Sequence, residues 1–294
     1  MSDSANVLTA FQPAHEFFVG IDSDGCVFDS MEIKHKECFA PMFIKHFRLQ
    51  AVSKYAREVW EFVNLYSKTR GINRFPALSN ALNLLVERPE VQARGVQPWK
   101  TDVLDEWIAR EPKLSNAALK KEIEAGNAAL QQVMEWSNAV NAAIEDIVFG
   151  VPPFPLVSET LLRLNEAADV IVVSQTPTEA LEREWTEHGI ASHAKLIAGQ
   201  ELGTKTDHLK LASGGKYPPR HVLMIGDAPG DFKAAKANHA LFFPIVPGNE
   251  EAWWQHLFDE GIERFLNDTF AGDYEAELLK AFNASLPEKP SWRV

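Results

Sequence analysis

Four short apolar segments constrain the fold of this chain more than any other feature of its sequence. Each is apolar at consecutive positions and lacks the alternation of a strand with one solvated face. Such segments are typical of parallel strands that helices cover on both faces of a sheet. The segments are Phe17–Ile21, Val170–Val173, Val222–Ile225 and Leu241–Ile245.

Helical patterns separate the last three of these segments. Apolar spacing predicts a helix from Pro177 to Gly189, with Leu181 and Trp185 on one face, and a shorter helix from Asp231 to Asn238. Strands that alternate with helices are typical of a parallel sheet wound by helices on both faces. The sequence therefore predicts an α/β fold with a Rossmann-like, doubly wound core.

A helical segment is inserted directly after the first predicted strand. From residue 31 to about residue 149 the apolar spacing is helical and no strand is predicted. Ser115 is expected to cap the start of the longest helix in this segment. The proline-bearing run Gly150–Pro155 is the expected return to the sheet.

These patterns divide the chain into two predicted domains. We expect an α/β core domain formed by residues 1–30 and 151–294, and an all-helical cap domain formed by residues 31–150. The apolar residues after Glu250 predict helix packed on the core. The last stretch, residues 285–294, is expected to be a loose end.

The charge of the chain limits the classes of partner that we expect it to bind. Its 294 residues include 29 basic and 41 acidic side chains, a net charge of −12 at pH 7. An acidic surface of this size repels phosphate backbones and anionic lipid, so we expect neither nucleic acid nor membrane as a partner. The longest uncharged stretch, Ala237–Asn249, is shorter than the ~20 residues that span a bilayer. Two cysteines and no secretory pattern at the N-terminus predict a cytoplasmic protein.

Acidic residues follow two of the predicted strands where each strand ends. Asp22 and Asp24 follow the first apolar segment, and Asp227 and Asp231 follow the third. If these strands and the second segment, which ends before Ser174, are neighbours, we expect the four aspartates to converge on one small volume, because parallel strands end at one edge of a sheet. Crowded carboxylates repel one another, and a hard divalent cation relieves that repulsion. The sequence therefore predicts a Mg²⁺ site, since zinc would favour His or Cys ligands.

The same strand ends carry a resemblance to a known family. The chain resembles the haloacid-dehalogenase-like (HAD) hydrolases, in the group with a helical cap after the first motif. The resemblance extends from about Phe17 to Pro247 and depends on four motifs in the family's order. These motifs are FFVGIDSDGCVFDS, the strand that ends at Ser174, the Lys205 of GTKTDHL, and GDAPGD.

The resemblance implies a role for each aspartate. Asp22 would attack phosphorus to give an aspartyl-phosphate, and Asp24 would protonate the leaving oxygen and then activate water. Mg²⁺ would be held by Asp22, the backbone carbonyl of Asp24, and Asp227, with Asp231 assisting directly or through water. Family members that displace halide, cleave phosphonates or pump ions lack an Asp at the position of Asp24. This residue therefore favours phosphoryl transfer.

The resemblance also implies residues that hold the phosphoryl group. Ser174 and Lys205 would bind its non-bridging oxygens, and backbone N–H groups near Gly25 and Gln175 would add donors. Two alternatives remain at this stage. Ser174 is also placed to cap the helix that follows it, and Lys210 is the rival of Lys205 as the motif lysine.

Two further positions stand out. Residues 67–74 of the cap carry three cations around a glycine, and Arg70 or Arg74 would contact the far side of an anionic substrate. The alternative for these residues is a solvated turn between helices. Cys26 stands where the family usually has Thr, and its thiol is a poorer hydrogen-bond donor, so the loop after Asp24 is expected to be held less firmly.

The function implied by the resemblance is Mg²⁺-dependent hydrolysis of a small phosphorylated metabolite through an aspartyl-phosphate. Two alternatives are an intramolecular phosphomutase of the same family, whose cap would exclude water long enough to return the phosphoryl group, and a catalytically silent binding protein. The four aspartates disfavour the silent protein.

Overall fold

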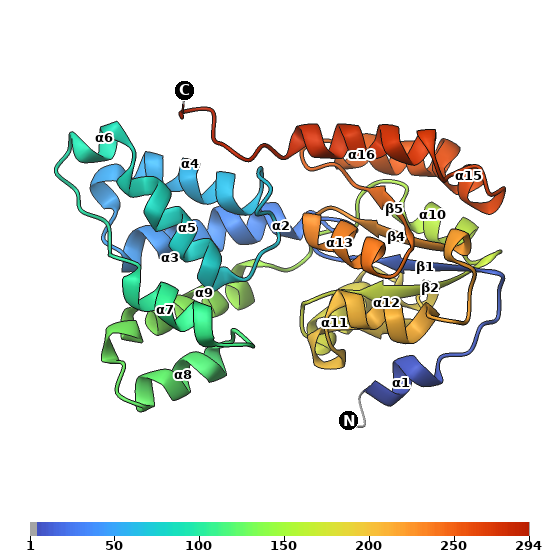
Figure 1. The fold of residues 1–294 in the computed structure, drawn as a ribbon, viewed down its shortest axis with the longest axis horizontal. Coiled ribbons are helices and arrows are strands. Elements are labelled where there is room, and N and C mark those ends of the chain that lie inside the picture. Colours follow the sequence, from blue (N-terminus) through green and yellow to red (C-terminus); the bar gives the residue numbers. More distant parts are fainter. Residues whose placement is uncertain (1–4, 294) are drawn as a thin grey trace. The chain divides into compact units, whose positions relative to one another are not determined.

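The computed structural model describes residues 5–293, and one part of it is built around a sheet of five parallel strands (Figure 1). The strand order is β3-β2-β1-β4-β5, and the central strand β1 pairs in parallel with β2 and with β4. This arrangement confirms the predicted α/β fold. The strands are β1 (Phe17–Ile21), β2 (Ala168–Val173), β3 (Leu196–Ala198), β4 (Val222–Gly226) and β5 (Leu241–Pro244).

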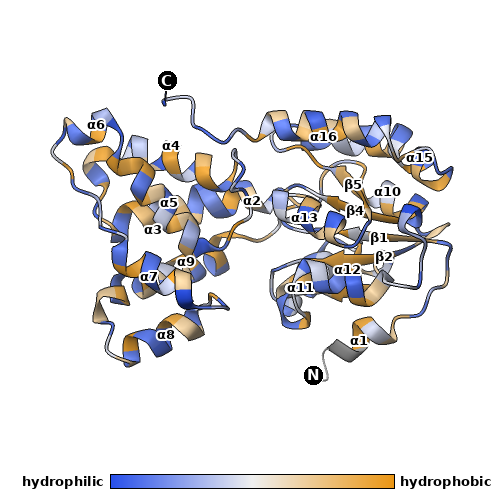
Figure 2. Ribbon diagram, in the orientation of Figure 1, coloured by the Kyte–Doolittle hydropathy of each residue, from blue (hydrophilic) through white to orange (hydrophobic). Residues whose placement is uncertain are grey.

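Helices cover both faces of the sheet, which explains why the strands lack alternation. Val19 and Ile21 of β1 belong to a buried apolar cluster on one face, and Phe18 belongs to a cluster on the other face. Figure 2 shows apolar strands between helices of mixed polarity. The first cluster includes side chains of α10 (Val157–Leu164), α11 (Thr178–Glu187), α14 (Glu250–His256) and α15 (Ile262–Leu266). The second cluster includes side chains of α1 (Ala5–Ala10), α12 (Lys205–Ser213) and α13 (Pro229–Ala237). Helix α16 (Asp273–Ser285) contributes side chains to both clusters.

The strand register brings the predicted site residues to one edge of the sheet. Ile21 at the end of β1 lies opposite Val172 of β2 and Ile225 of β4. The residues that follow these positions therefore leave the sheet side by side. This edge is the carboxyl end of the strands, where an open parallel sheet binds its ligands.

Strand β3 is the one strand of the sheet that the sequence did not predict. It has three residues, and Leu196 and Ile197 are only half-buried at the edge of the sheet. Three residues are too few to show a period. The two predicted helices are present as α11 and α13, and α13 begins at Pro229 because proline is well suited to the first helical turn.

The inserted segment forms a helical unit with its own core. Residues 31–149, all of which the structure describes, contain no strand, as predicted. Trp60, Trp107 and Trp136 are buried at its centre. The helices are α2 (Ser30–Ile33), which continues through the π-helical turn Lys34–Phe39 into α3 (Ala40–His46), then α4 (Ser53–Asn64), α5 (Arg74–Val86), α6 (Pro89–Gln92), α7 (Asp102–Arg110), α8 (Asn116–Glu124) and α9 (Gln131–Ile147).

The helix that Ser115 caps is shorter than predicted. The Ser115 Oγ accepts a hydrogen bond from the Ala118 N–H at 3.1 Å, so the predicted cap is present. The helix ends at Glu124, however, and α9 is a separate and longer helix. Gly126, with a φ of +113°, lies between the two, in a backbone conformation that no helix contains.

The chain divides into two compact units. One joins residues 5–30 to Gly150–Leu286, and the other joins Met31–Phe149 to residues 287–293. The last residues therefore belong with the helical unit and not with the core domain to which the sequence assigned them. Residues 1–4 and 294, which the sequence also assigned to the core domain, lie outside the described part of the chain.

The prediction of a loose C-terminal end is wrong, because the last residues pack on the helical unit. Trp292 packs its ring against the ring of Phe62 in α4, with the centroids 5.5 Å apart, and lies under the Arg88 guanidinium. Aromatic packing of this kind stabilises an ordered segment that composition alone would leave free.

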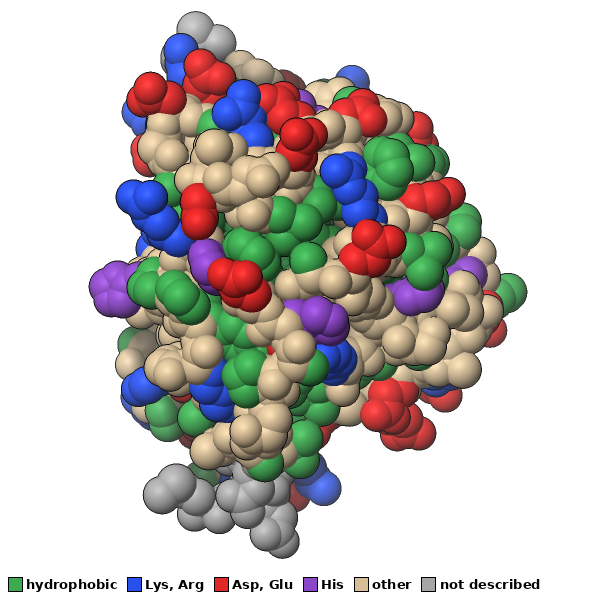
Figure 3. All heavy atoms as spheres, turned by 90° about the vertical axis from the view of Figure 1, so that its right-hand side faces the viewer, with side chains coloured by type: hydrophobic (Ala, Val, Ile, Leu, Met, Phe, Trp, Pro, Cys, Tyr) green, Lys and Arg blue, Asp and Glu red, His purple; other side chains and the backbone are tan. Residues whose placement is uncertain are grey.

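The surface offers no basic stripe on the face that Figure 3 shows, where acidic and basic side chains are interspersed among apolar ones. None of the helices within residues 5–293 combines the length and apolar character that crossing a membrane requires.

Candidate active site

The loop after β1 carries the first two aspartates in a tight turn. The Asp22 N–H donates to the carbonyl of Ile225 at 3.0 Å and so extends the pairing of β1 with β4. The Ser23 carbonyl then accepts from the N–H groups of Val27 at 2.8 Å and Phe28 at 3.1 Å. Gly25 has a φ of +76°, the left-handed conformation that glycine adopts without strain. This closed turn fixes where the side chains of the loop point.

Two buried tryptophans hold the same loop. The Trp185 indole N–H donates to the Ser23 Oγ at 3.0 Å, and the Trp254 indole N–H donates to the Cys26 carbonyl at 2.8 Å. Cys26 is itself fully buried, and burial, followed by the charge of Asp227, raises the pKa of its thiol. The loop is therefore held by backbone and indole hydrogen bonds rather than by the side chain at position 26.

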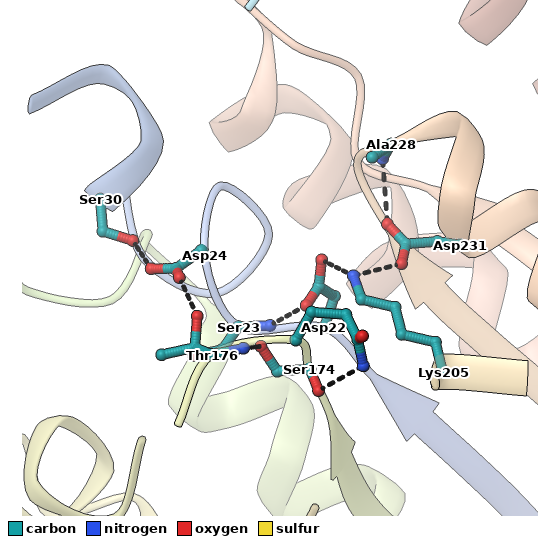
Figure 4. Close-up of polar contacts among 10 residues, drawn as sticks. Asp22, Ser23, Asp24, Ser30, Ser174, Thr176, Lys205, Ala228 and Asp231 are labelled. Carbon is teal, nitrogen blue, oxygen red and sulfur yellow. Dashed lines mark hydrogen bonds and ion pairs between the residues drawn. The ribbon is translucent and has the colours of Figure 1, made fainter. Parts of the chain in front are cut away.

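Three buried carboxylates converge at the carboxyl edge of the sheet. Asp22 follows β1, Asp227 follows β4, and Asp231 lies in the first turn of α13. One carboxylate oxygen from each lies within 4.8 Å of the others. Each of the three is at most 4% exposed. The predicted convergence is thus seen for these residues, and Figure 4 shows Asp22 and Asp231 turned toward each other.

A glycine makes room for Asp231. The Asp231 carboxylate turns back along its helix and accepts from the Ala228 N–H at 3.0 Å. A Cβ at Gly226 would lie 2.5 Å from both the Cβ and the Cγ of Asp231. No real Cβ comes that close to another carbon, so only glycine at position 226 allows Asp231 to reach the cluster.

Lys205 is the cation of the cluster. It begins α12, where Thr204 and Asp207 form a capping box, and its Nζ lies 2.6 Å from the Asp22 Oδ2 and 2.6 Å from the Asp231 Oδ1 (Figure 4). Burial alone would lower the pKa of Lys205, but the two carboxylates outweigh it and raise that pKa, so the ammonium stays charged. Lys210 is exposed at the end of the same helix. Lys205 is thus the lysine that the fold brings to the aspartates.

The cluster carries more negative charge than Lys205 balances. Burial, then the charges of Asp231 and Asp227, raise the pKa of Asp22 well above its usual range, and Lys205 opposes them. With all three carboxylates ionised beside one ammonium, the local charge would be −2. A divalent cation would supply the missing charge, and the donor set of buried oxygens without His or Cys fits Mg²⁺.

Asp24 lies apart from this cluster. Its carboxylate accepts a hydrogen bond from the Thr176 Oγ1 at 2.6 Å and another from the Ser30 hydroxyl, one on each oxygen (Figure 4). Two hydroxyls that can also accept hydrogen bonds suit a carboxyl group that gains and loses a proton. The side chain of Asp24 is not part of the three-carboxylate group, which leaves its backbone carbonyl as the predicted ligand atom.

Ser174 and Gln175 are placed differently from each other. Ser174 is buried at the end of β2, and its Oγ accepts from the Thr176 N–H at 3.2 Å. The Gln175 amide donates to the carbonyls of Gly203 at 3.0 Å and Ser174 at 3.2 Å. The Gly25 N–H donates within its own turn, to the Phe28 carbonyl at 2.8 Å. The Gln175 side-chain amide is therefore engaged with backbone carbonyls, as is the Gly25 N–H, one of the backbone donors expected here.

Of the two cap arginines, Arg70 is buried and Arg74 is half-buried within the helical unit. Arg70 is 2% exposed and donates to the Leu65 carbonyl at 3.0 Å. Arg74 lies over the ring of Phe39 and donates to the Asn141 Oδ1 at 2.7 Å and to the Ser137 Oγ at 2.9 Å. Burial lowers the pKa of Arg74 to about 10. No carboxylate in the described residues pairs with Arg74.

Sequence reasoning missed the residues that position the aspartates. Thr176 and Ser30 hold Asp24, and Trp185 and Trp254 hold the loop. Ser30 is the last residue of the first motif and Thr176 lies two residues after the second, so their proximity to these motifs was an available signal. The tryptophans lie far from the loop in the sequence, and nothing in a linear pattern predicts their hydrogen bonds.

No protein-family model and no curated protein matches the chain. Among solved structures, it is similar to a haloacid dehalogenase-like hydrolase from Streptococcus pneumoniae, with 12% identity, a TM-score of 0.47, and coverage of 81% of this chain and 90% of the other. A predicted phosphoglycolate phosphatase from Haemophilus somnus has 16% identity, a TM-score of 0.45, and coverage of 79% and 86%. A haloacid dehalogenase-like hydrolase from Xanthomonas campestris has 10% identity, a TM-score of 0.44, and coverage of 84% and 93%. These values are too low to assign an activity, which must be inferred from the site.

The close approach at Gly226 generates a paired prediction. Gly226→Ala should lower the melting temperature, because the new methyl group would displace Asp231 from Lys205 and from the Ala228 N–H. Gly230→Ala is the matched control, since a Cβ there meets nothing within 4 Å and alanine favours helix. Differential scanning calorimetry compares them. Equal melting temperatures would mean that Asp231 does not depend on position 226.

The charge imbalance generates a second prediction. Mg²⁺ should raise the melting temperature, because it binds the folded cluster and not the unfolded chain. At a Mg²⁺ concentration of about 100 times the Kd, this binding should raise the free energy of unfolding by about 2.7 kcal/mol. Asp227→Asn should raise the melting temperature of the metal-free protein by relieving repulsion, and should reduce its response to Mg²⁺. A wild-type melting temperature that does not change when Mg²⁺ is added would contradict the assignment of this cluster as a Mg²⁺ site.

Proposed function

We propose that the protein is a Mg²⁺-dependent phosphatase that hydrolyses a small phosphomonoester through an aspartyl-phosphate on Asp22. The observation that carries the proposal is the separation of two carboxylates in one turn. Asp22 lies in a charged cluster with Lys205, whereas Asp24, two residues later, is held outside it by two hydroxyls. Nucleophilic and acid–base chemistry require two carboxylates in such different surroundings.

Asp22 is the residue suited to attack phosphorus. Its Oδ1 accepts from the Ser23 N–H at 2.8 Å and its Oδ2 from Lys205, so the carboxylate is fixed in one orientation. Fixing the nucleophile lowers the entropic cost of reaching the in-line geometry. Mg²⁺ bound by Asp22, Asp227 and Asp231 would neutralise the phosphoryl oxygens that otherwise repel a carboxylate. Lys205 keeps its positive charge beside the same group and stabilises the charge that develops there.

Asp24 is the residue suited to move the proton. In the first step its carboxyl group would donate a proton to the leaving oxygen, and in the second the resulting carboxylate would take one from the attacking water. The hydroxyls of Thr176 and Ser30 serve both states, because each can donate to the carboxylate or accept from the acid. This role agrees with the resemblance to the HAD phosphatases, in which an Asp stands at this position.

Ser174 and Lys205 are proposed to hold the phosphoryl oxygens. Ser174 leaves the sheet beside Asp22 in the strand order, and its hydroxyl proton is free to turn toward a ligand while its oxygen accepts from the Thr176 N–H. Lys205 already bridges two of the three aspartates. A cation at this place offsets part of the charge that a phosphate would bring.

Arg74 is proposed to bind the body of the substrate from the cap. Among the residues that the structure describes, its guanidinium contacts only neutral acceptors and an aromatic ring, although it is half-buried. Arg88 in the same unit is more deeply buried, at 4% exposed, and it pairs with Glu58 and Glu90. A half-buried cation without a carboxylate partner attracts an anionic ligand. Arg70, also in the predicted loop, remains a second candidate for this contact.

The two aspartates of the first turn give the direct test of the mechanism. Asp22→Asn should abolish turnover, because the amide cannot form the acyl phosphate. Asp24→Asn should slow the hydrolysis of an alkyl phosphate by about 10²–10⁴-fold. The loss in the first step should be smaller for p-nitrophenyl phosphate, whose leaving group needs no proton. Rapid-quench measurements of both substrates separate the two steps.

Asp29→Asn is the matched control for these variants, since Asp29 is exposed in the same segment. It should retain wild-type turnover with both substrates. Wild-type turnover by Asp22→Asn, or equal losses for the alkyl and aryl phosphates in the first step of Asp24→Asn, would sink the assignment of roles.

The half-buried Arg74 of the cap generates a separate prediction. Arg74→Met should raise the KM of an anionic native substrate far more than that of p-nitrophenyl phosphate, because Arg74 would contact only the substrate body. Arg57→Met, on the exposed face of α4, is the matched control. An Arg74→Met enzyme with an unchanged substrate profile would leave this arginine a purely structural role.

A further inference from the structure

Residues 287–293 form a third connection between the two units of the chain. The chain passes from the core unit to the helical unit after Ser30, returns before Gly150, and passes to the helical unit again after Leu286. An inserted domain with two connections can rotate about the line that joins them. A third connection restricts that rotation if both of its ends are firmly held.

The first end of the segment is anchored in the core unit. Helix α16 ends at Ser285, and Leu286, directly after it, is fully buried in the apolar cluster on one face of the sheet. Phe282 of the same helix lies in that cluster, with its ring centroid 5.6 Å from that of Phe242 in β5. Freeing this end would require exposing apolar surface to water.

The second end is anchored in the helical unit by Trp292. Its ring meets the edge of Phe62 with the centroids 5.5 Å apart, and the guanidinium of Arg88 lies 4.5 Å from its centroid. Aromatic pairs and cation–π contacts each stabilise a contact beyond the apolar area that they bury. The indole therefore docks in a defined place rather than covering a random patch.

Arg88 is built into the unit independently of the tail. Its guanidinium pairs with Glu58 at 2.8 Å and with Glu90 at 3.3 Å, and it lies 4.7 Å from the ring centroid of Tyr55. Arg88 is 4% exposed. Two carboxylates and an aromatic ring thus fix the guanidinium, so it presents a rigid cationic face on which an indole can stack.

Shorter contacts hold the rest of the segment. The Lys68 N–H donates to the Pro287 carbonyl at 3.3 Å, and Arg293 forms an ion pair with Glu87. Lys68 belongs to the basic segment 67–74 that the sequence singled out. Pro287 and Pro290 each fix one backbone dihedral, so the segment has less conformational freedom to lose when it docks.

The length of the segment limits the distance between its two anchors, Leu286 and Trp292. Six residue steps separate Leu286 from Trp292. An extended chain covers at most 3.3–3.6 Å per residue, so the two anchors stay within about 20 Å of each other while both are docked. We propose that residues 287–293 are a strap that restricts the motion of the helical unit relative to the core, with Trp292 as its releasable end.

Spin-label distances test the strap without reference to enzymatic activity. Labels at Lys54→Cys in the helical unit and Glu182→Cys in the core occupy exposed positions, and the native Cys26 and Cys38 are buried. In this background, Trp292→Ala should broaden the distance distribution and extend it to longer distances. Lys289→Ala, an exposed position of the same segment, is the matched control and should leave it unchanged.

A second variant separates tethering from folding. Inserting ten Gly and Ser residues between Glu288 and Lys289 keeps Trp292 and its partners but lengthens the strap. The distribution should broaden as in Trp292→Ala, while the melting temperature stays near that of the wild type. Distributions that match the wild type in both variants would overturn the proposal. A second outcome would also overturn it: the insertion variant keeps the wild-type distance distribution, and Trp292→Ala unfolds the helical unit. Trp292 would then contribute only to folding.

Discussion

The repulsion among Asp22, Asp227 and Asp231 is the constraint on which the rest of the site depends. Three carboxylates share one small buried volume with a single ammonium group, that of Lys205. Folding alone would not place them there, because each unpaired buried charge costs several kcal/mol. The arrangement is stable only with a positive charge of two units or with protons, and the first of these suits a protein that binds Mg²⁺ and phosphate.

The parallel sheet makes this concentration of charge possible. Strands β1 and β4 end side by side, so two residues that are 205 positions apart in the sequence, Asp22 and Asp227, leave the sheet together. The absence of a side chain at Gly226 lets Asp231 turn back into the same volume. On the other side of Asp22, the turn closed by Ser23 carries Asp24 away to the hydroxyls of Thr176 and Ser30. The backbone thus separates two chemically similar residues into different environments.

Much of this could be predicted from the sequence, and the limits have physical causes. Four strands were visible because each is long enough and buried on both faces, whereas β3, with three residues of which two are half-exposed at the edge, left no pattern. The aspartates were visible because they follow strands directly. The indole hydrogen bonds of Trp185 and Trp254, by contrast, join residues more than 160 positions apart. The docking of Trp292 was hidden because a Pro-rich polar stretch is typical of a free end, and only its contacts with Phe62 and Arg88 show otherwise.

The central claim is that Asp22 carries the phosphoryl group. Acid quenching during turnover with Mg²⁺, followed by borohydride reduction, converts an aspartyl-phosphate to homoserine, and mass spectrometry of the peptide that spans residues 17–30 locates it. The account predicts homoserine at position 22 in the presence of substrate and none in its absence, with position 24 unchanged. Reduction at another aspartate, or no reduction while phosphate is released at the full rate, would contradict it.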